Sequence, residues 1–125
     1  MKQLLIIAIV MLLLDFIYLH SMSDFFNKVV MRVQGTKIKF NVIGAILCYI
    51  LLIGGLNYFI ISRIKTFGIK KSLMDAFILG IVIYGVYETT TYTLFDKWSP
   101  LAMVIDTLWG GILFTLTTYI TYKIV

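Results

Sequence analysis

LMDAFILGIVIYGVYETTTYTLF, residues 73–95, is long and apolar enough to cross a membrane as a helix, yet it carries a glutamate in its second half. At about 1.5 Å per residue, a helix of about 20 residues covers the roughly 30 Å hydrocarbon core of a bilayer. An acidic side chain inside such a helix is costly and usually marks a pathway or a site. Glu88 is therefore the first candidate functional residue, and its partners are expected in the other apolar stretches.

The composition of the 125-residue chain is that of a membrane protein. Hydrophobic residues make up 61% of it, charged residues make up 14%, and the mean hydropathy is +0.99. Soluble domains are about half apolar and about a quarter charged. The length favours a single domain, residues 1–125. The net charge of +5 comes from bases at the ends of apolar blocks, where lipid headgroups lie, so we expect no nucleic-acid partner.

Four membrane spans are predicted, which makes the fold class an all-α, polytopic membrane protein. The predicted spans cover about residues 4–20, 40–62, 73–95 and 100–122. Ser99 and Pro100 are a typical helix start, because the hydroxyl caps the first turn and the proline has no N–H to leave unbonded. Ser72 and Asp75 have the spacing of a capping box, which predicts the start of the third span.

The segment at about residues 22–33 predicts a short interfacial helix. Its apolar side chains fall on one helical face, and its polar side chains fall on the other: Asp24, Asn27, Lys28 and Arg32. A short, basic, two-faced helix of this kind usually lies along the membrane surface. A lid over a cavity or a partner-binding surface is the alternative.

The distribution of lysine and arginine predicts that both termini are cytoplasmic. With four spans, the termini share one side with the loop at residues 63–71, which contains four bases and no acid. That side carries six bases against five: Lys2, Arg63, Lys65, Lys70, Lys71 and Lys123 against Lys28, Arg32, Lys37, Lys39 and Lys97. Because the two sides differ by only one base, the chain could also insert in both orientations and form an antiparallel homodimer. Membrane lipids are the other expected partners.

Three acids lie inside predicted spans, and their spacing predicts that they converge. Asp15 is five residues before the end of the first span, Glu88 is seven before the end of the third, and Asp106 is six after the start of the fourth. At about 1.5 Å per residue, all three should lie about 7–11 Å below the same, non-cytoplasmic surface. Such a cluster could bind a cation, pass protons or act as an acid–base pair.

Aromatic and hydroxyl side chains share helical faces with these acids. Polar faces of this kind belong against protein, because lipid offers no hydrogen-bond partner. We therefore predict a site for a ligand, an ion or protons that consists of Asp15, Tyr18, Tyr84, Tyr87, Glu88, Thr91, Asp106 and Trp109.

Small residues predict where helices pack closely. Gly44, Cys48 and Gly55 fall along one side of the second span, and Gly110 shares a face with Asp106 in the fourth. Cys48 is the only cysteine, so no intrachain disulfide is possible.

Two sequence blocks, YGVYETT at residues 84–90 and DTLWG at residues 106–110, flank Trp98 and resemble a family of small predicted membrane proteins of bacteria and large DNA viruses, domain of unknown function 2177. Asp15 followed by Tyr18 is similar to the first-span motif of the family, and the similarity extends over nearly the whole chain. Thr91 stands where the family usually has asparagine. The resemblance implies four membrane helices and a motif cluster, but no activity; the cluster is Asp15, Tyr87, Glu88, Asp106, Trp109 and Gly110.

Three functions are compatible with these features. The first is a proton- or cation-coupled channel or transporter, by analogy of size and layout with small four-span exporters. The second is a structural or assembly protein of a membrane with no transport activity. The third is a lipid-modifying enzyme, which is the least favoured. The sequence has no nucleophile motif and no clustered metal ligands, so no catalytic residue, metal or cofactor is predicted.

Overall fold

The computed structural model describes residues 2–36, 38 and 41–125, and their secondary structure is helical. α1 spans Lys2–Ser21, α2 Ser23–Gln34, α3 Val42–Phe59, α5 Ile69–Leu94 and α6 Pro100–Ile124. A 3₁₀ turn, η1 (Ile61–Arg63), and the short α4 (Ile64–Phe67) link α3 to α5. These ranges contain no strand, which confirms the all-α fold class.

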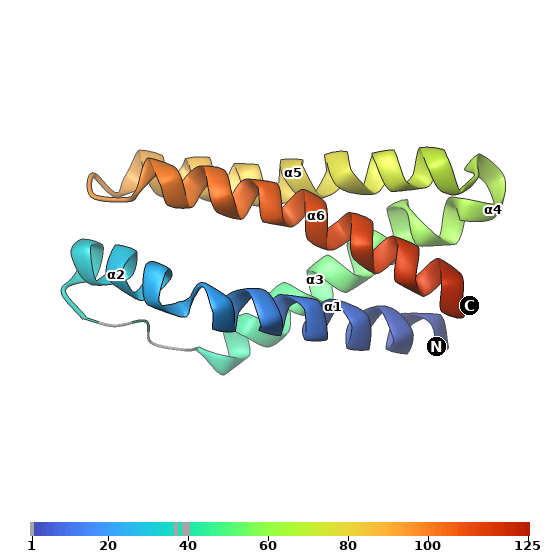
Figure 1. The fold of residues 1–125 in the computed structure, drawn as a ribbon, viewed down its shortest axis with the longest axis horizontal. Helices are drawn as coiled ribbons and strands as arrows, with labels where there is room; N and C mark the ends of the chain where they lie inside the picture. Colours follow the sequence, from blue (N-terminus) through green and yellow to red (C-terminus); the bar gives the residue numbers. More distant parts are fainter. Residues whose placement is uncertain (1, 37, 39–40) are drawn as a thin grey trace.

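The long helices run back and forth along one axis (Figure 1). α1 and α2 lead from the N-terminus toward the end of the molecule where α5 and α6 are joined, and α3 returns obliquely. Both termini lie at the opposite end, near α4. α5 and α6 are antiparallel neighbours over most of their length, α1 packs on α6, and α3 packs on α1. The core between the helices includes Ile7, Met11, Leu56, Leu113 and Phe114.

Three segments are long and apolar enough to cross a membrane: Lys2–Ser21, Val42–Phe67 and Pro100–Ile124. They correspond to the first, second and fourth predicted spans. α5 is not among them, so the third predicted span is not confirmed. α5 carries polar side chains in both halves: Lys70, Lys71, Ser72 and Asp75 near its start, and Glu88 with four threonines in its second half.

Capping side chains start α3 and α6. The Ser99 hydroxyl accepts a hydrogen bond from the Ala102 amide at 3.1 Å, and α6 begins at Pro100 as the sequence predicts. The Asn41 side chain accepts one from the Gly44 amide at 3.0 Å, and α3 begins at Val42. The predicted first residue of this span, at position 40, lies outside the described residues.

The predicted capping box at Ser72 is wrong. α5 begins three residues earlier, at Ile69, because Gly68 adopts a positive φ of 83° and lets the chain turn from α4 directly into α5. Ser72 is therefore buried inside the helix. Asp75 is not a cap but pairs with Lys71 at 2.9 Å.

α2 covers the segment in which the sequence predicts an amphipathic helix. It ends at Gly35, whose φ of 79° lets its amide N–H donate to the Met31 carbonyl oxygen at 2.8 Å. Val29 is buried, whereas Lys28 and Arg32 are exposed, so the helix is two-faced. Its orientation along a membrane surface stays a prediction.

Candidate functional site

The antiparallel helices α1 and α6 each present an aspartate followed three residues later by an aromatic donor. Asp15 on α1 accepts a hydrogen bond from the Trp109 indole N–H of α6 at 2.9 Å. Asp106 on α6 accepts one from the Tyr18 hydroxyl of α1 at 3.1 Å. Because residues i and i+3 share a helical face, the two motifs pair reciprocally. The Tyr18 and Trp109 rings stack with centroids 4.4 Å apart and an interplanar angle of 2°.

A third helix joins this pair at Asp15. The Tyr49 hydroxyl of α3 donates a hydrogen bond to the second carboxylate oxygen of Asp15. Only 6% of Asp15 is exposed, and a buried carboxylate needs such donors in place of water. Asp15 therefore fixes the relative positions of α1, α3 and α6 at this level.

Glu88 enters the cluster from α5. Only 1% of it is exposed, and its Oε1 accepts a hydrogen bond at 2.9 Å from the indole N–H of Trp98, in the turn between α5 and α6. The Glu88 side chain also lies beside the Asp106 carboxyl group of α6. Two adjacent carboxyl groups repel each other when both are ionised, so the pair favours keeping one proton.

Within the described ranges, no basic side chain pairs with these three acids. The ion pair that these ranges contain joins Lys71 to Asp75, near the start of α5. The donors to the acids are neutral hydroxyl and indole groups, which stabilise a carboxylate without cancelling its charge. The same ranges contain no group of three His, Cys, Asp or Glu side chains that could hold a metal ion. Among the described residues, the acids therefore have hydrogen-bond donors but no basic partner.

A cavity of about 640 Å³ opens beside the cluster, lined by residues of α1, α3, α5 and α6. Its volume lies in the range of small-molecule sites, about 300–1,000 Å³. Two kinds of side chain line it. The polar lining is Asp15, Tyr18, Cys48, Tyr49, Tyr84, Tyr87 and Asp106, and the apolar lining is Leu19, Ala45, Leu51, Leu52 and Ile83.

The other predicted site residues of α5 take different positions. Tyr84 lines the cavity and stands edge-on to the Phe114 ring. Tyr87 also lines the cavity, but 62% of it is exposed. The Thr91 hydroxyl donates to the Tyr87 carbonyl oxygen at 2.8 Å, so Thr91 bonds within its own helix and is not joined to the acids.

Two donors of the cluster, Tyr49 and Trp98, are absent from the predicted site. Tyr49 lies on the helix where the sequence pattern emphasises small residues, and Trp98 lies ten residues after Glu88, in a turn. A buried tyrosine or tryptophan needs a partner for its O–H or N–H. That requirement marks both residues as donors in need of an acceptor, but it does not say which acid each one meets.

The closest helix packing joins α5 to α6 and depends on glycines. A Cβ added at Gly80 would lie 2.1 Å from the Gly110 carbonyl oxygen, which is far inside van der Waals contact. A Cβ at Gly110 would lie 2.4 Å from the Tyr84 ring, and one at Gly111 would lie 2.8 Å from the Phe77 ring. Gly110 is a predicted packing residue, whereas Gly80 and Gly111 are not among the predicted ones.

The predicted packing face of α3 makes no comparable contact within one copy of the chain. Gly44 and Cys48 are exposed, and a Cβ at Gly44 would meet only the side chain of Asn41. No atom lies within 4 Å of a Cβ built on Gly55. Figure 1 shows that α3 crosses the other helices obliquely instead of lying along one of them, as α5 lies along α6.

Comparison with known proteins agrees with this architecture. No curated protein and no solved structure matches the chain. The family described as "Predicted membrane protein (DUF2177)" matches residues 1–123, nearly the whole length. Together with the three apolar helices, this match indicates an integral membrane protein. The family resemblance carried by the sequence motifs is thereby confirmed, and the chain belongs to the DUF2177 family of predicted membrane proteins.

Proposed function

We propose that the chain crosses the membrane four times and exchanges protons for a largely apolar organic cation at the carboxyl cluster. The four-span arrangement is supported by the packing of α5. It lies antiparallel to α6 over most of its length, so it occupies the same depth as a helix that can span. Its 26 residues are about 39 Å long, more than the hydrocarbon core requires.

The main support for the proposal is a cavity beside acids that have no basic partner among the described residues. Asp15 and Asp106 both line it, and neutral donors leave their charge uncompensated. Four tyrosines also line the cavity, and aromatic faces attract cations electrostatically. Much of the remaining wall is aliphatic, which favours a cation with an apolar body over a hydrated metal ion.

Proton exchange is supported by the contact between Glu88 and Asp106. The two adjacent carboxyl groups favour keeping one proton, because like charges repel, and a cation near Asp106 would favour the loss of that proton. Binding of the cation and release of the proton are therefore coupled. This coupling is the minimum that a proton-driven exporter requires.

Binding of tetraphenylphosphonium, a rigid aromatic cation, tests the proposal. Calorimetric titration of the purified chain in detergent should show binding that weakens as the pH falls, because protons compete for the carboxylates. Asp106→Asn should weaken binding at least tenfold, as expected for the loss of a charged partner. Asp75→Asn, which removes an acid outside the cluster, is the matched control and should bind as the wild type does. Equal affinity for the Asp106 and control variants would refute the proposal.

A structural role is the second candidate, because every acid of the cluster already accepts a hydrogen bond from an aromatic donor. Glu88→Gln and Glu88→Ala separate the two roles. Glutamine keeps an acceptor for Trp98 but cannot release a proton, whereas alanine leaves the indole unpaired. In liposomes, a transporter should lose proton-coupled flux in the glutamine variant. A purely structural residue should leave flux unchanged with glutamine and lose thermal stability only with alanine.

A further inference from the structure

We expect α2 to lie at a membrane surface because of its position in the chain. It begins at Ser23, two residues after the last residue of α1, and α1 is long and apolar enough to span. The next candidate span begins at Val42. The chain between these helices therefore leaves and re-enters the membrane on one side, and α2 has headgroups within its reach.

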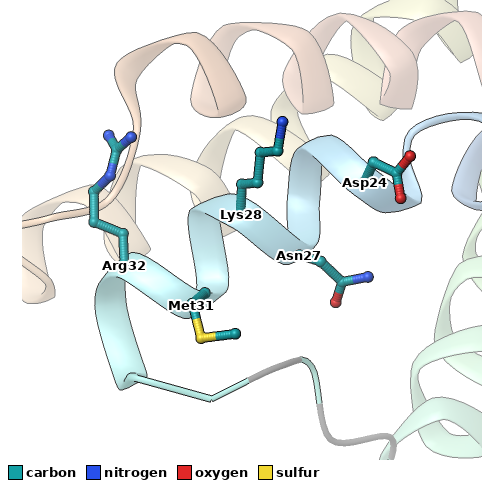
Figure 2. A pocket seen from close by; sticks show the side chains of 5 residues that line it. All are labelled: Asp24, Asn27, Lys28, Met31 and Arg32. Atoms are coloured by element: carbon teal, nitrogen blue, oxygen red, sulfur yellow. The ribbon is translucent and has the colours of Figure 1, made fainter.

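The polar face of α2 forms a pocket of about 480 Å³ lined by Asp24, Asn27, Lys28, Met31 and Arg32. Figure 2 shows the Lys28 and Arg32 side chains extending from the same side of the helix, as their spacing of four residues requires. Both are exposed, and neither forms an ion pair with any described carboxylate. Asp24 stands one turn before Lys28 but does not neutralise it.

The other lining residues have neutral or acceptor groups, and Figure 2 shows Asn27 and Met31 extending from the opposite edge of the helix to the two bases. The Asn27 carboxamide oxygen accepts a hydrogen bond from the Ile38 amide at 3.4 Å, which leaves its NH₂ group as a donor. Met31 is 42% exposed and gives the pocket an apolar wall. The pocket thus combines two positive charges, an amide donor, a carboxylate and apolar surface.

We propose that this pocket binds the head group of an anionic phospholipid. Lys28 and Arg32 bind the phosphate, for which a guanidinium and an ammonium are the usual partners. Asp24 and Asn27 bind hydroxyl groups of a polyol head group such as glycerol, and Met31 contacts the start of the acyl chains. The position at the membrane surface favours a lipid over a free anion, because lipid phosphates are concentrated there. This site does not depend on transport at the carboxyl cluster.

Lipid-dependent thermal stability of the purified full chain in detergent tests this site. Phosphatidylglycerol should stabilise the wild type at concentrations where phosphatidylcholine and inorganic phosphate do not. Lys28→Gln with Arg32→Gln should lower the apparent affinity for phosphatidylglycerol about 25-fold, since each base near an anionic surface is worth about a factor of five. The lipid-free melting temperature should not change, because both side chains are exposed.

A matched control removes the same charge elsewhere: Lys65→Gln with Lys97→Gln, also at exposed positions, should keep the wild-type affinity. The exchange Lys28→Arg with Arg32→Lys should stay within about threefold of the wild type, since it keeps both charges. It also tests the site if the neutral variant proves unstable. Equal loss in the control pair would show general electrostatic attraction and overturn the proposal. Equal stabilisation by phosphatidylcholine or by inorganic phosphate would overturn it as well.

Discussion

α6 carries polar side chains that face other helices or lie buried in two regions, and the two regions are built differently. Near its start, Asp106 accepts a hydrogen bond from Tyr18 of α1 and lies beside Glu88 of α5. Near its end, three threonine hydroxyl groups are fully buried and have no hydrogen-bond partner among the described residues: Thr117, Thr118 and Thr121. The same helix therefore has an acid region around Asp106, whose carboxyl group accepts a hydrogen bond from another helix. It also has a threonine region at Thr117, Thr118 and Thr121, whose hydroxyl groups have no partner among the described residues.

The difference follows from what each group costs when it is buried alone. An unpaired carboxylate in an apolar interior is far more costly than an unpaired hydroxyl, whose burial costs about 1–3 kcal/mol. The acid region therefore needs donors from other elements, and α1, α3 and the α5–α6 turn supply them. The threonine region can be held by packing alone. Polar contacts thus specify how the helices meet at one end, and apolar packing does so at the other.

A substitution at the glycine contact between these two regions should lower the free energy of unfolding most, because both regions depend on the close approach of α5 and α6. Gly80→Ala places a Cβ against the Gly110 backbone, which cannot move aside as a flexible side chain would. We expect a loss of about 3 kcal/mol or more in the free energy of unfolding, measured by circular dichroism in mixed micelles.

Gly54→Ala is the matched control for this change. It adds the same methyl group to α3 at a position with no atom within 4 Å. We expect it to stabilise the chain by up to about 1 kcal/mol, the difference in helix propensity between glycine and alanine. Equal effects of the two substitutions would mean that α5 and α6 do not approach as closely as the contact requires.

Trp109→Phe should lower the free energy of unfolding by an intermediate amount, and it should do so by changing contacts of the acid region alone. It keeps an aromatic ring to stack on Tyr18 but removes the N–H that Asp15 accepts at 2.9 Å. We expect a loss of about 1.5–3 kcal/mol, as for a hydrogen bond to a charged group. Tyr122→Phe, at an exposed position of the same helix, should change stability by less than about 0.5 kcal/mol. A loss as small as that of the control would show that this bond is not needed to hold Asp15.

The sequence predicts the acid region better than the rest, and the reason is physical. Equal depth on three helices and the spacing of Asp15 and Asp106 from their aromatic neighbours follow from helix geometry, so these side chains can be grouped without a structure. Tyr49 and Trp98 could not be assigned to particular acids, because pairing across helices depends on how the helices cross. The path of α3 also depends on how the helices cross. For this reason its small residues predict close packing that is not made within one copy of the chain.

A substitution in the threonine region should change the free energy of unfolding least, and in the opposite direction from a substitution in the acid region. Thr118→Val removes a buried hydroxyl that has no partner, so its effect on the free energy of unfolding should lie between neutral and about 1 kcal/mol stabilising. Thr115→Val is the matched change on the same helix, because the Thr115 hydroxyl donates to the Gly111 carbonyl oxygen at 2.8 Å. It should cost about 0.6 kcal/mol, the average for a hydrogen bond inside a membrane protein. If Thr118→Val is instead the more damaging of the two, its hydroxyl has a partner such as bound water, and the two regions of α6 are both held by polar contacts.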